Sequence, residues 1–352
     1  MWQDDMQSIS DKQALDRYCT ALARKPLLVQ GAGGNISFKK NNVLWIKASG
    51  MCLADAEDKN IFLPVDLNHL KNEIRKKNYS VSPIRLCATH LKPSIETCLH
   101  ALMPQSIVLH LHPVEVLTYL VRQNALKTIS SLLKDTKFKW ICVDYYKPGS
   151  TLARAVKEAL DAAIDVEIVF LKNHGIVVAG NNIAQVDLIL NRLLQKFITQ
   201  KKFLPTSNFT IPACLQIDDL ITYFPSTDKY VHCLAMQKSL FVRLRRAWAI
   251  CPDHVVFLGG EPRIYNDVSS LYSELSNDNF NALPKTIFIK GKGVFFLRKG
   301  HVLEQTQLRC YYEILSRQQI DQRLNVLTEA QILELVNWEA EKYRMQVLVK
   351  GV

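Results

Sequence analysis

Two spacings of apolar residues alternate along the first 200 residues of the chain. Helical spacing, with apolar positions three and four residues apart, predicts one set of segments. These predicted helices span residues 10–24, 66–76, 94–103, 114–121, 150–163 and 183–201. Short apolar runs bounded by turn-forming residues predict strands instead. The predicted strands span residues 35–38, 43–47, 106–112, 139–143, 166–171 and 176–179.

The predicted strands and helices do not alternate in a strict βαβ rhythm. We therefore expect an α/β fold of the α+β type, with a central mixed or antiparallel sheet flanked by helices. A polar, proline-containing linker at residues 204–218 leads to a smaller C-terminal α/β region. Its predicted strands lie near residues 254–258 and 285–297, and its predicted helices near 307–321 and 328–343. The predicted domains are residues 1–205 and 215–352.

The composition is that of a globular protein, with 48% hydrophobic and 22% charged residues. The chain has no run of 18 apolar residues and no apolar segment near its start, so we expect a cytoplasmic protein with no membrane partner. Its nine cysteines are widely spaced without a C-x-x-C pair, which favours free thiols over disulfides or a thiolate zinc site. The net charge of +11 is spread along the chain, which indicates a solvated basic surface or attraction of small anions rather than a nucleic-acid partner.

Three histidines stand out as candidate metal ligands. His110 and His112 occupy alternate positions of a predicted strand, so both side chains project from one face. Their Cα atoms are expected about 6.6 Å apart, a separation that suits two rings on one cation. His174 follows Asn173 and precedes Gly175 at a predicted hairpin tip. A random H-x-H arises roughly one time in four or five in such a chain, so hydrogen-bonded structural histidines are the alternative.

Two further features lie upstream of these histidines. Glu96 precedes His110 by fourteen residues, and a carboxylate near a bound substrate can move a proton on and off carbon. An ordinary glutamate in the first turn of a helix is the alternative. Gly33, Gly34 and Asn35 form a turn whose backbone N–H groups could cradle an anion. A tight entry into a hairpin explains these glycines equally well.

Taken in order, five blocks of residues resemble the class II aldolase/adducin family, which includes fuculose-phosphate and rhamnulose-phosphate aldolases. The blocks are Gly34-Asn35-Ile36-Ser37, Lys47-Ala48-Ser49-Gly50, Pro93-Ser94-Ile95-Glu96, His110-Leu111-His112-Pro113 and Asn173-His174-Gly175. This resemblance covers about residues 8–203. Residues 252–259 and 289–295 are similar to the extension that follows the aldolase domain in bifunctional rhamnulose-phosphate aldolase/dehydrogenases, without the dehydrogenase.

The resemblance implies a metal-dependent catalytic domain in residues 1–205. In the family, the histidines matching His110, His112 and His174 hold a divalent metal, most often Zn²⁺. The glutamate matching Glu96 is the acid/base in the cleavage or formation of a C–C bond through a metal-stabilised enediolate of a small ketose or ketose phosphate. The resemblance also implies a homo-oligomer, a cyclic tetramer. The residues expected to bind the substrate, chiefly its phosphate, are Gly34, Asn35, Ser49, Gly50 and Ser94.

The sequence departs from the family pattern at Ile95, where fuculose-type enzymes have a second serine, and a phosphorylated substrate is correspondingly less well supported. Tyr145 and Tyr146 are candidates for the residue that protonates the leaving oxygen by composition only. The same scaffold supports dehydratases, decarboxylases and 4-epimerases, although epimerases generally carry aspartate at the position of Glu96. A non-catalytic, adducin-like interaction protein is a further alternative, which retention of the metal histidines disfavours.

Overall fold

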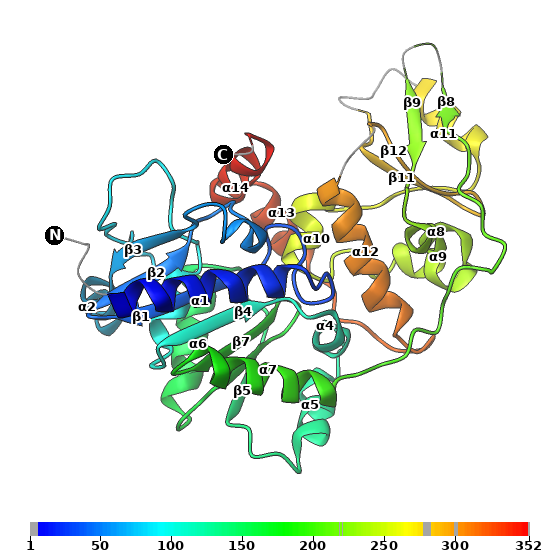
Figure 1. Cartoon of the computed structure of the whole chain (residues 1–352). Helices are drawn as coiled ribbons and strands as arrows, with labels where there is room; N and C mark the ends of the chain where they lie inside the picture. The colour runs from blue at the N-terminus through cyan, green and yellow to red at the C-terminus, as the bar shows by residue number, and fades with distance from the viewer. Residues whose placement is uncertain (1–5, 218, 220, 277–282, 299–301, 351–352) are drawn as a thin grey trace. The chain divides into compact units, whose positions relative to one another are not determined.

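The computed structural model (Figure 1) divides the chain into two compact units. It describes residues 6–217, 219, 221–276, 283–298 and 302–350. Unit 1 comprises Met1–Leu120, Asn124–Ile198 and Asn337–Val352, and unit 2 comprises Val121–Gln123 and Thr199–Val336. The expected assignment of residues 1–205 as the catalytic domain and of residues 215–352 as a C-terminal extension stays a prediction.

Unit 1 is built around a sheet of seven strands in the order β3-β2-β1-β4-β7-β6-β5. The strands are β1 (Asn35–Lys40), β2 (Val43–Lys47), β3 (Phe62–Asp66), β4 (Ile107–Leu111), β5 (Trp140–Val143), β6 (Ile168–Leu171) and β7 (Gly175–Gly180). Neighbouring strands are antiparallel except β5 and β6, which are parallel. The prediction of a mixed sheet flanked by helices is therefore confirmed.

Local sequence explains one hairpin of this sheet and why one strand escaped prediction. Asn41 and Asn42 both have positive φ angles of 50° and 62°, as a two-residue hairpin turn between β1 and β2 requires. Strand β3 was not predicted, because Pro64 and Asp66 interrupt its apolar pattern. It lies at the edge of the sheet, where a proline that cannot donate a ladder hydrogen bond is tolerated.

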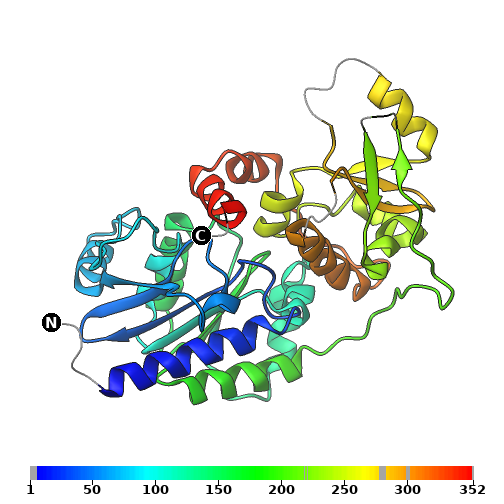
Figure 2. The ribbon, with the colours of Figure 1, turned by 45° about the horizontal axis from the view of Figure 1, so that its top comes forward.

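Helices cover both faces of the sheet in unit 1 (Figure 2). On one face, Leu99 and Leu152 pack with Val108 and Val177 of the central strands in a buried core. On the other face, α1 and α7 run side by side, and Tyr18 donates a 3.1 Å hydrogen bond to Asp187 between them. The helices of this unit are α1 (Met6–Ala23), α2 (Leu67–Arg75), α3 (Thr97–Leu102), α4 (Val114–Leu120), α5 (Ala125–Leu133), α6 (Ser150–Asp161), α7 (Ile183–Lys196) and α14 (Glu339–Lys350), with the short 3₁₀ helix η1 (Leu53–Asp55).

Unit 2 contains a five-stranded sheet in the order β10-β11-β12-β9-β8. Its strands are β8 (Leu215–Gln216), β9 (Thr222–Pro225), β10 (Arg263–Tyr265), β11 (Thr286–Ile289) and β12 (Gly293–Phe296). Tyr223, Ile287 and Phe295 lie in its buried core. The helices are α8 (Lys229–Met236), α9 (Lys238–Leu244), α10 (Pro252–Leu258), α11 (Val268–Ser276), α12 (Val302–Ser316) and α13 (Glu329–Val336).

Two predictions for the C-terminal region were wrong in detail. Residues 254–258, expected as a strand, belong to helix α10. Pro252 occupies the first turn of that helix, where its missing N–H costs nothing, and Asp253 complements the helix dipole there. The single helix expected at 328–343 is two helices, α13 and α14, separated at residues 337–338. Within the described part of the chain, no helix is both long and apolar enough to cross a membrane.

Candidate active site

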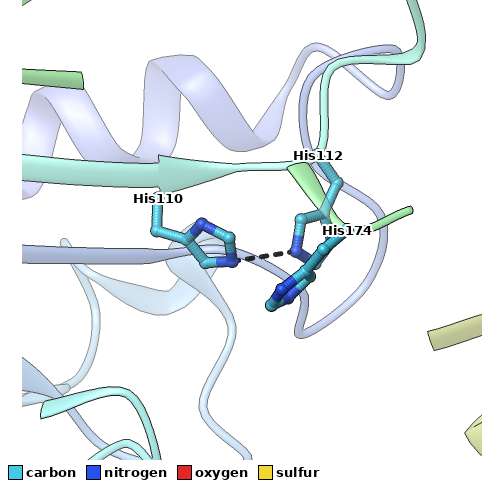
Figure 3. Close-up of side chains that lie close together, drawn as sticks. All are labelled: His110, His112 and His174. Carbon is cyan, nitrogen blue, oxygen red and sulfur yellow. Dashed lines mark hydrogen bonds between the residues drawn. The ribbon is translucent and has the colours of Figure 1, made fainter. Parts of the chain in front are cut away.

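Strand β4 places His110 and His112 at one end of the central sheet of unit 1 (Figure 3). His110 pairs with Asn35 of β1 on one side and with Val177 of β7 on the other, so ladder hydrogen bonds fix its backbone from both sides. His112 follows the last residue of the strand. The Nε2 atoms of the two rings lie 3.1 Å apart, which shows that both side chains project from the same face, as strand geometry requires.

The turn between β6 and β7 brings His174 to the same place. Asn173 adopts a left-handed conformation with φ 55°, which lets the chain reverse over three residues. A side chain on Gly175 would meet the carbonyl oxygen of Leu111 at 2.4 Å and the ring of His112 at 2.8 Å. Glycine is therefore needed there for His174 to approach the other two rings.

The three histidines form a group that could hold a metal ion. One ring nitrogen from each lies within 4.8 Å of the others, and the residues are only 1%, 8% and 6% exposed in chain order. Two nitrogens bound to one zinc ion lie at most about 4.2 Å apart, so small ring rotations suffice to bring this group onto one ion. The donor set therefore fits a borderline metal such as zinc, with room for a further ligand.

Backbone contacts and burial prepare His110 as a neutral ligand. Its Nδ1 atom lies 3.0 Å from the carbonyl oxygen of Ile176. A hydrogen on Nδ1 that is donated to this oxygen leaves the lone pair of Nε2 directed at the other rings. Burial is the main reason why the pKa of His110 lies well below its usual range, and the neighbouring rings of His174 and His112 lower this pKa further. The ring is consequently unprotonated at neutral pH, as metal binding requires.

Glu96 lies against the histidines. It is 4% exposed, and its carboxylate oxygens lie 3.4 Å from Nε2 of His110 and 3.6 Å from Nε2 of His174. The side-chain amide of Asn35 donates a 2.7 Å hydrogen bond to Oε2 of this carboxylate. Helix α3 begins at Thr97 rather than at the expected Ser94, so Glu96 occupies the N-cap position.

The fold brings two of the residues expected to bind the substrate, Ser49 and Ser94, onto neighbouring segments. Ser49 donates a backbone hydrogen bond to Lys92, and a β-bridge joins Ala48 to Pro93, so the segments carrying Ser49 and Ser94 run side by side. The hydroxyl of Ser94 accepts a 3.2 Å hydrogen bond from the backbone of Glu96, two residues along. This arrangement connects the loop segments to the acid/base candidate.

Two of the predicted substrate-binding residues are glycines that the backbone requires. Gly34 has a φ of 74°, and a side chain there would approach the carbonyl oxygen of His110 to 3.0 Å. Gly50 has a φ of 83°. Both conformations favour glycine, so these glycines have a structural reason for their place in the motifs whether or not they contact a ligand.

One buried polar pair near the site was missed by sequence reasoning. His100 lies one turn beyond Glu96, and its Nδ1 atom is 2.8 Å from the hydroxyl of Ser37; both side chains are fully buried. Burial, with help from Lys39 and Lys47, lowers the pKa of His100 to about 3. The spacing of four residues from Glu96 on a helix was the available signal.

Part of the chain matches a known protein family and known proteins in sequence. A family model described as the class II aldolase and adducin N-terminal domain matches residues 13–188, half of the chain. L-fuculose phosphate aldolase of Methanococcus maripaludis is 30% identical over 158 residues, covering 45% of this chain and 78% of that protein.

Two other relatives extend the comparison. An uncharacterized oxidoreductase, YuxG of Bacillus subtilis, is 30% identical over 164 residues, which are 42% of this chain but only 23% of that protein. Among solved structures, the chain is similar to the N-terminal class II aldolase domain of a conserved Thermoplasma acidophilum protein, at 21% identity and a TM-score of 0.44, over 52% of this chain and 89% of that one. On the family match, the chain belongs to the class II aldolase and adducin family.

Proposed function

We propose that this protein is a metal-dependent lyase that cleaves or forms a C–C bond in a small ketose or ketose phosphate. His110, His112 and His174 are the proposed ligands of a divalent ion, with zinc as the preferred metal because the donors are three imidazoles. When bound, such an ion supplies a Lewis acid that stabilises negative charge on the substrate oxygens beside the bond that breaks.

Glu96 is the proposed acid/base. In the cleavage direction, the hydroxyl on the departing carbon passes its proton through solvent to the carboxylate of Glu96, the C–C bond breaks, and an aldehyde leaves. Glu96 then delivers a proton to the carbon that remains, and in the synthetic direction it removes this proton. Asn35 orients the carboxylate by donating to one of its oxygens, and the other oxygen is the one that faces His174.

The observation that carries this proposal is the position of one buried carboxylate beside two of three converging imidazoles. A group that moves protons on a metal-bound substrate must lie within a few ångströms of the metal ligands without being required as a ligand itself. Glu96 meets that condition. The membership of the chain in its family supports the same assignment.

The substrate's anionic end is proposed to lie toward Ser49 and Ser94. Their segments are paired with each other and continue directly into Glu96. Hydroxyl and backbone N–H donors suit a phosphate or a carboxylate. The side chain of Ile95, between Ser94 and Glu96, has no hydrogen-bond donor. The choice between a phosphate and a carboxylate therefore depends on the remaining groups. We also propose a homo-oligomer, a tetramer, which light scattering at micromolar concentration will check.

The experiment is a metal analysis of the purified protein, followed by incubation of the metal-loaded protein with a panel of ketose phosphates and free ketoses. Aldehyde release, followed with an NADH-linked reductase, is the expected result. A product that is an epimer, a dehydrated sugar or carbon dioxide overturns the lyase assignment in favour of that reaction. No turnover of any compound by fully metal-loaded protein favours an interaction protein of the adducin type.

A further inference from the structure

The last helix of the described chain, α14, belongs to unit 1 and lies against loops that carry the proposed substrate-binding residues. We call residues 48–51, 92–96 and 147–149 the cradle loops. A side chain placed on Gly50 in the first loop would touch Val347, and one placed on Gly149 in the third would lie 3.5 Å from the ring of Trp338. Lys92 in the second loop lies over the ring of Tyr343. The helix and the residue before it therefore contact all three loops.

The cradle loops form one continuous surface beneath α14. The pairing of Ser49 with Lys92 and of Ala48 with Pro93 joins the first two loops. A side chain on Gly149 would lie 3.6 Å from the carbonyl oxygen of Ile95, which places the third loop beside the second. Ser49 and Ser94 are only 8% and 6% exposed on this surface.

Space is the first reason why α14 and an anion exclude each other. A Cβ atom on Gly50 would lie 2.6 Å and 2.7 Å from two side-chain atoms of Val347, and 3.1 Å from the carbonyl oxygen of Arg344. No room therefore exists for even a methyl group on this side of Gly50. A phosphate group is larger than a methyl group, so it cannot enter here while the helix is docked.

Charge is the second reason. The ammonium groups of Lys92 and Lys147 lie 4.5 Å and 4.6 Å from the ring centroids of Tyr343 and Trp338, and both lysines belong to cradle loops. These cation–π contacts help to hold α14 and the residue before it in place. A phosphate binds ammonium groups through charge-assisted hydrogen bonds, and these are stronger than the contact of an ammonium group with a ring face. An anion on the cradle loops therefore competes for the same two cations.

From these contacts we propose that α14 is a lid, which occupies the place of the substrate's anionic group and is displaced when an anion binds to the cradle loops. This inference rests on the proposed function in taking Ser49 and Ser94 as that binding place. Displacement is expected to expose the amides of α14 and to free Lys92 and Lys147 for the anion.

The first test uses the full-length, metal-loaded protein and inorganic phosphate as the probe. Hydrogen exchange of the amides in residues 339–350 is followed by mass spectrometry as phosphate is added, with sodium chloride at equal ionic strength as the control. Phosphate, but not chloride, is expected to increase exchange in this segment. Phosphate binding that leaves this exchange unchanged, or that lowers it, overturns the lid.

The second test loosens the helix. Val347→Ala and Trp338→Ala each remove a contact with the cradle loops, and each is expected to tighten the apparent Kd for phosphate about tenfold, because the open state becomes more populated. Gln346→Ala changes an exposed position of the same helix and should leave the Kd unchanged. Calorimetry gives the Kd. Two variants that bind metal normally but bind phosphate no more tightly than the wild type overturn the lid.

The two proposals fail separately in these experiments. If the protein releases aldehyde from a sugar but phosphate does not change hydrogen exchange in α14, the proposed function stands and the lid proposal is wrong. If the protein has no lyase activity but phosphate increases hydrogen exchange in α14, the lid proposal stands and the proposed function is wrong.

Discussion

The two units of the chain each bury a cluster of ionisable side chains, and the clusters are built in opposite ways. In unit 2, Glu313 is fully buried and accepts 2.8 Å hydrogen bonds from Lys201 and Arg309, while Arg317 contacts its other oxygen. Burial raises the pKa of Glu313, but the hydrogen bonds from Lys201 and Arg317 outweigh it, so the pKa lies below the usual value. Opposite charges satisfy one another there.

In unit 1, by contrast, the buried cluster brings like groups together. Nε2 of His110 faces Nε2 of His112 at 3.1 Å, with His174 beside them. Burial and the two neighbouring rings depress the pKa of His110. Ring nitrogens converge at one place in this cluster, with the carboxylate of Glu96 beside them. Buried ionisable groups that neutralise each other thus indicate stability, whereas converging groups of one kind indicate binding.

The largest expected effect is on catalysis. Glu96→Gln keeps the size of the side chain but removes its ability to transfer protons, so turnover should fall by about 10²–10⁴-fold while metal content is retained. Steady-state kinetics and metal analysis on the same preparation give both quantities. Glu158→Gln, at an exposed position of α6, is the matched control and should behave as the wild type. Unchanged turnover in Glu96→Gln excludes the acid/base role.

The next effect is on stability and concerns unit 2. Glu313→Gln leaves three cations around a neutral side chain, and removal of one partner from a buried ion cluster costs about 3–5 kcal/mol. The free energy of unfolding, measured with urea, should fall by that amount while the metal content of the folded protein stays the same. Glu334→Gln, on the exposed side of α13, should change neither quantity. Loss of metal in Glu313→Gln contradicts a purely structural role.

The smallest expected effect is a dependence on pH. His100 has a pKa of about 3 in the folded chain because it is buried, whereas an unfolded histidine has a pKa of about 6.5. Between these values the unfolded chain binds a proton that the folded chain lacks, so the free energy of unfolding decreases as pH falls, by about 1.4 kcal/mol per pH unit from this group. Above pH 6.5 (the unfolded value) the contribution is constant.

His100→Gln tests this contribution, because glutamine does not titrate. Its free energy of unfolding, measured by urea at several pH values, should fall less steeply than that of the wild type as pH decreases below about 6.5. His90→Gln removes an exposed histidine and should leave the steep dependence intact. Parallel curves for wild type and His100→Gln are the outcome that this explanation does not allow.

Much of unit 1 was predictable, because its determinants are local. Alternation on a strand placed His110 and His112 on one face, and the turn around Asn173 placed His174 at a hairpin tip. The edge strand β3 was missed because Pro64 hides its pattern, and α10 was mistaken for a strand because a short apolar run is ambiguous between the two structures.

Contacts between distant segments were not predictable from sequence. Gly50 and Val347 touch across nearly the whole chain, and no spacing rule connects them. Without that contact, Ser49 and Gly50 look like an open cradle for an anion. With it, they lie beneath a helix that must move before the anion can bind.

We propose above that His110, His112 and His174 hold one catalytic metal ion. The most direct measurement is anomalous diffraction at the zinc absorption edge from crystals of the zinc-loaded protein. We expect a single strong peak in unit 1 at about 2.0–2.1 Å from one nitrogen of each ring, with Glu96 nearby. Fully zinc-loaded crystals with no peak between these three rings, or with zinc bound elsewhere only, would contradict it.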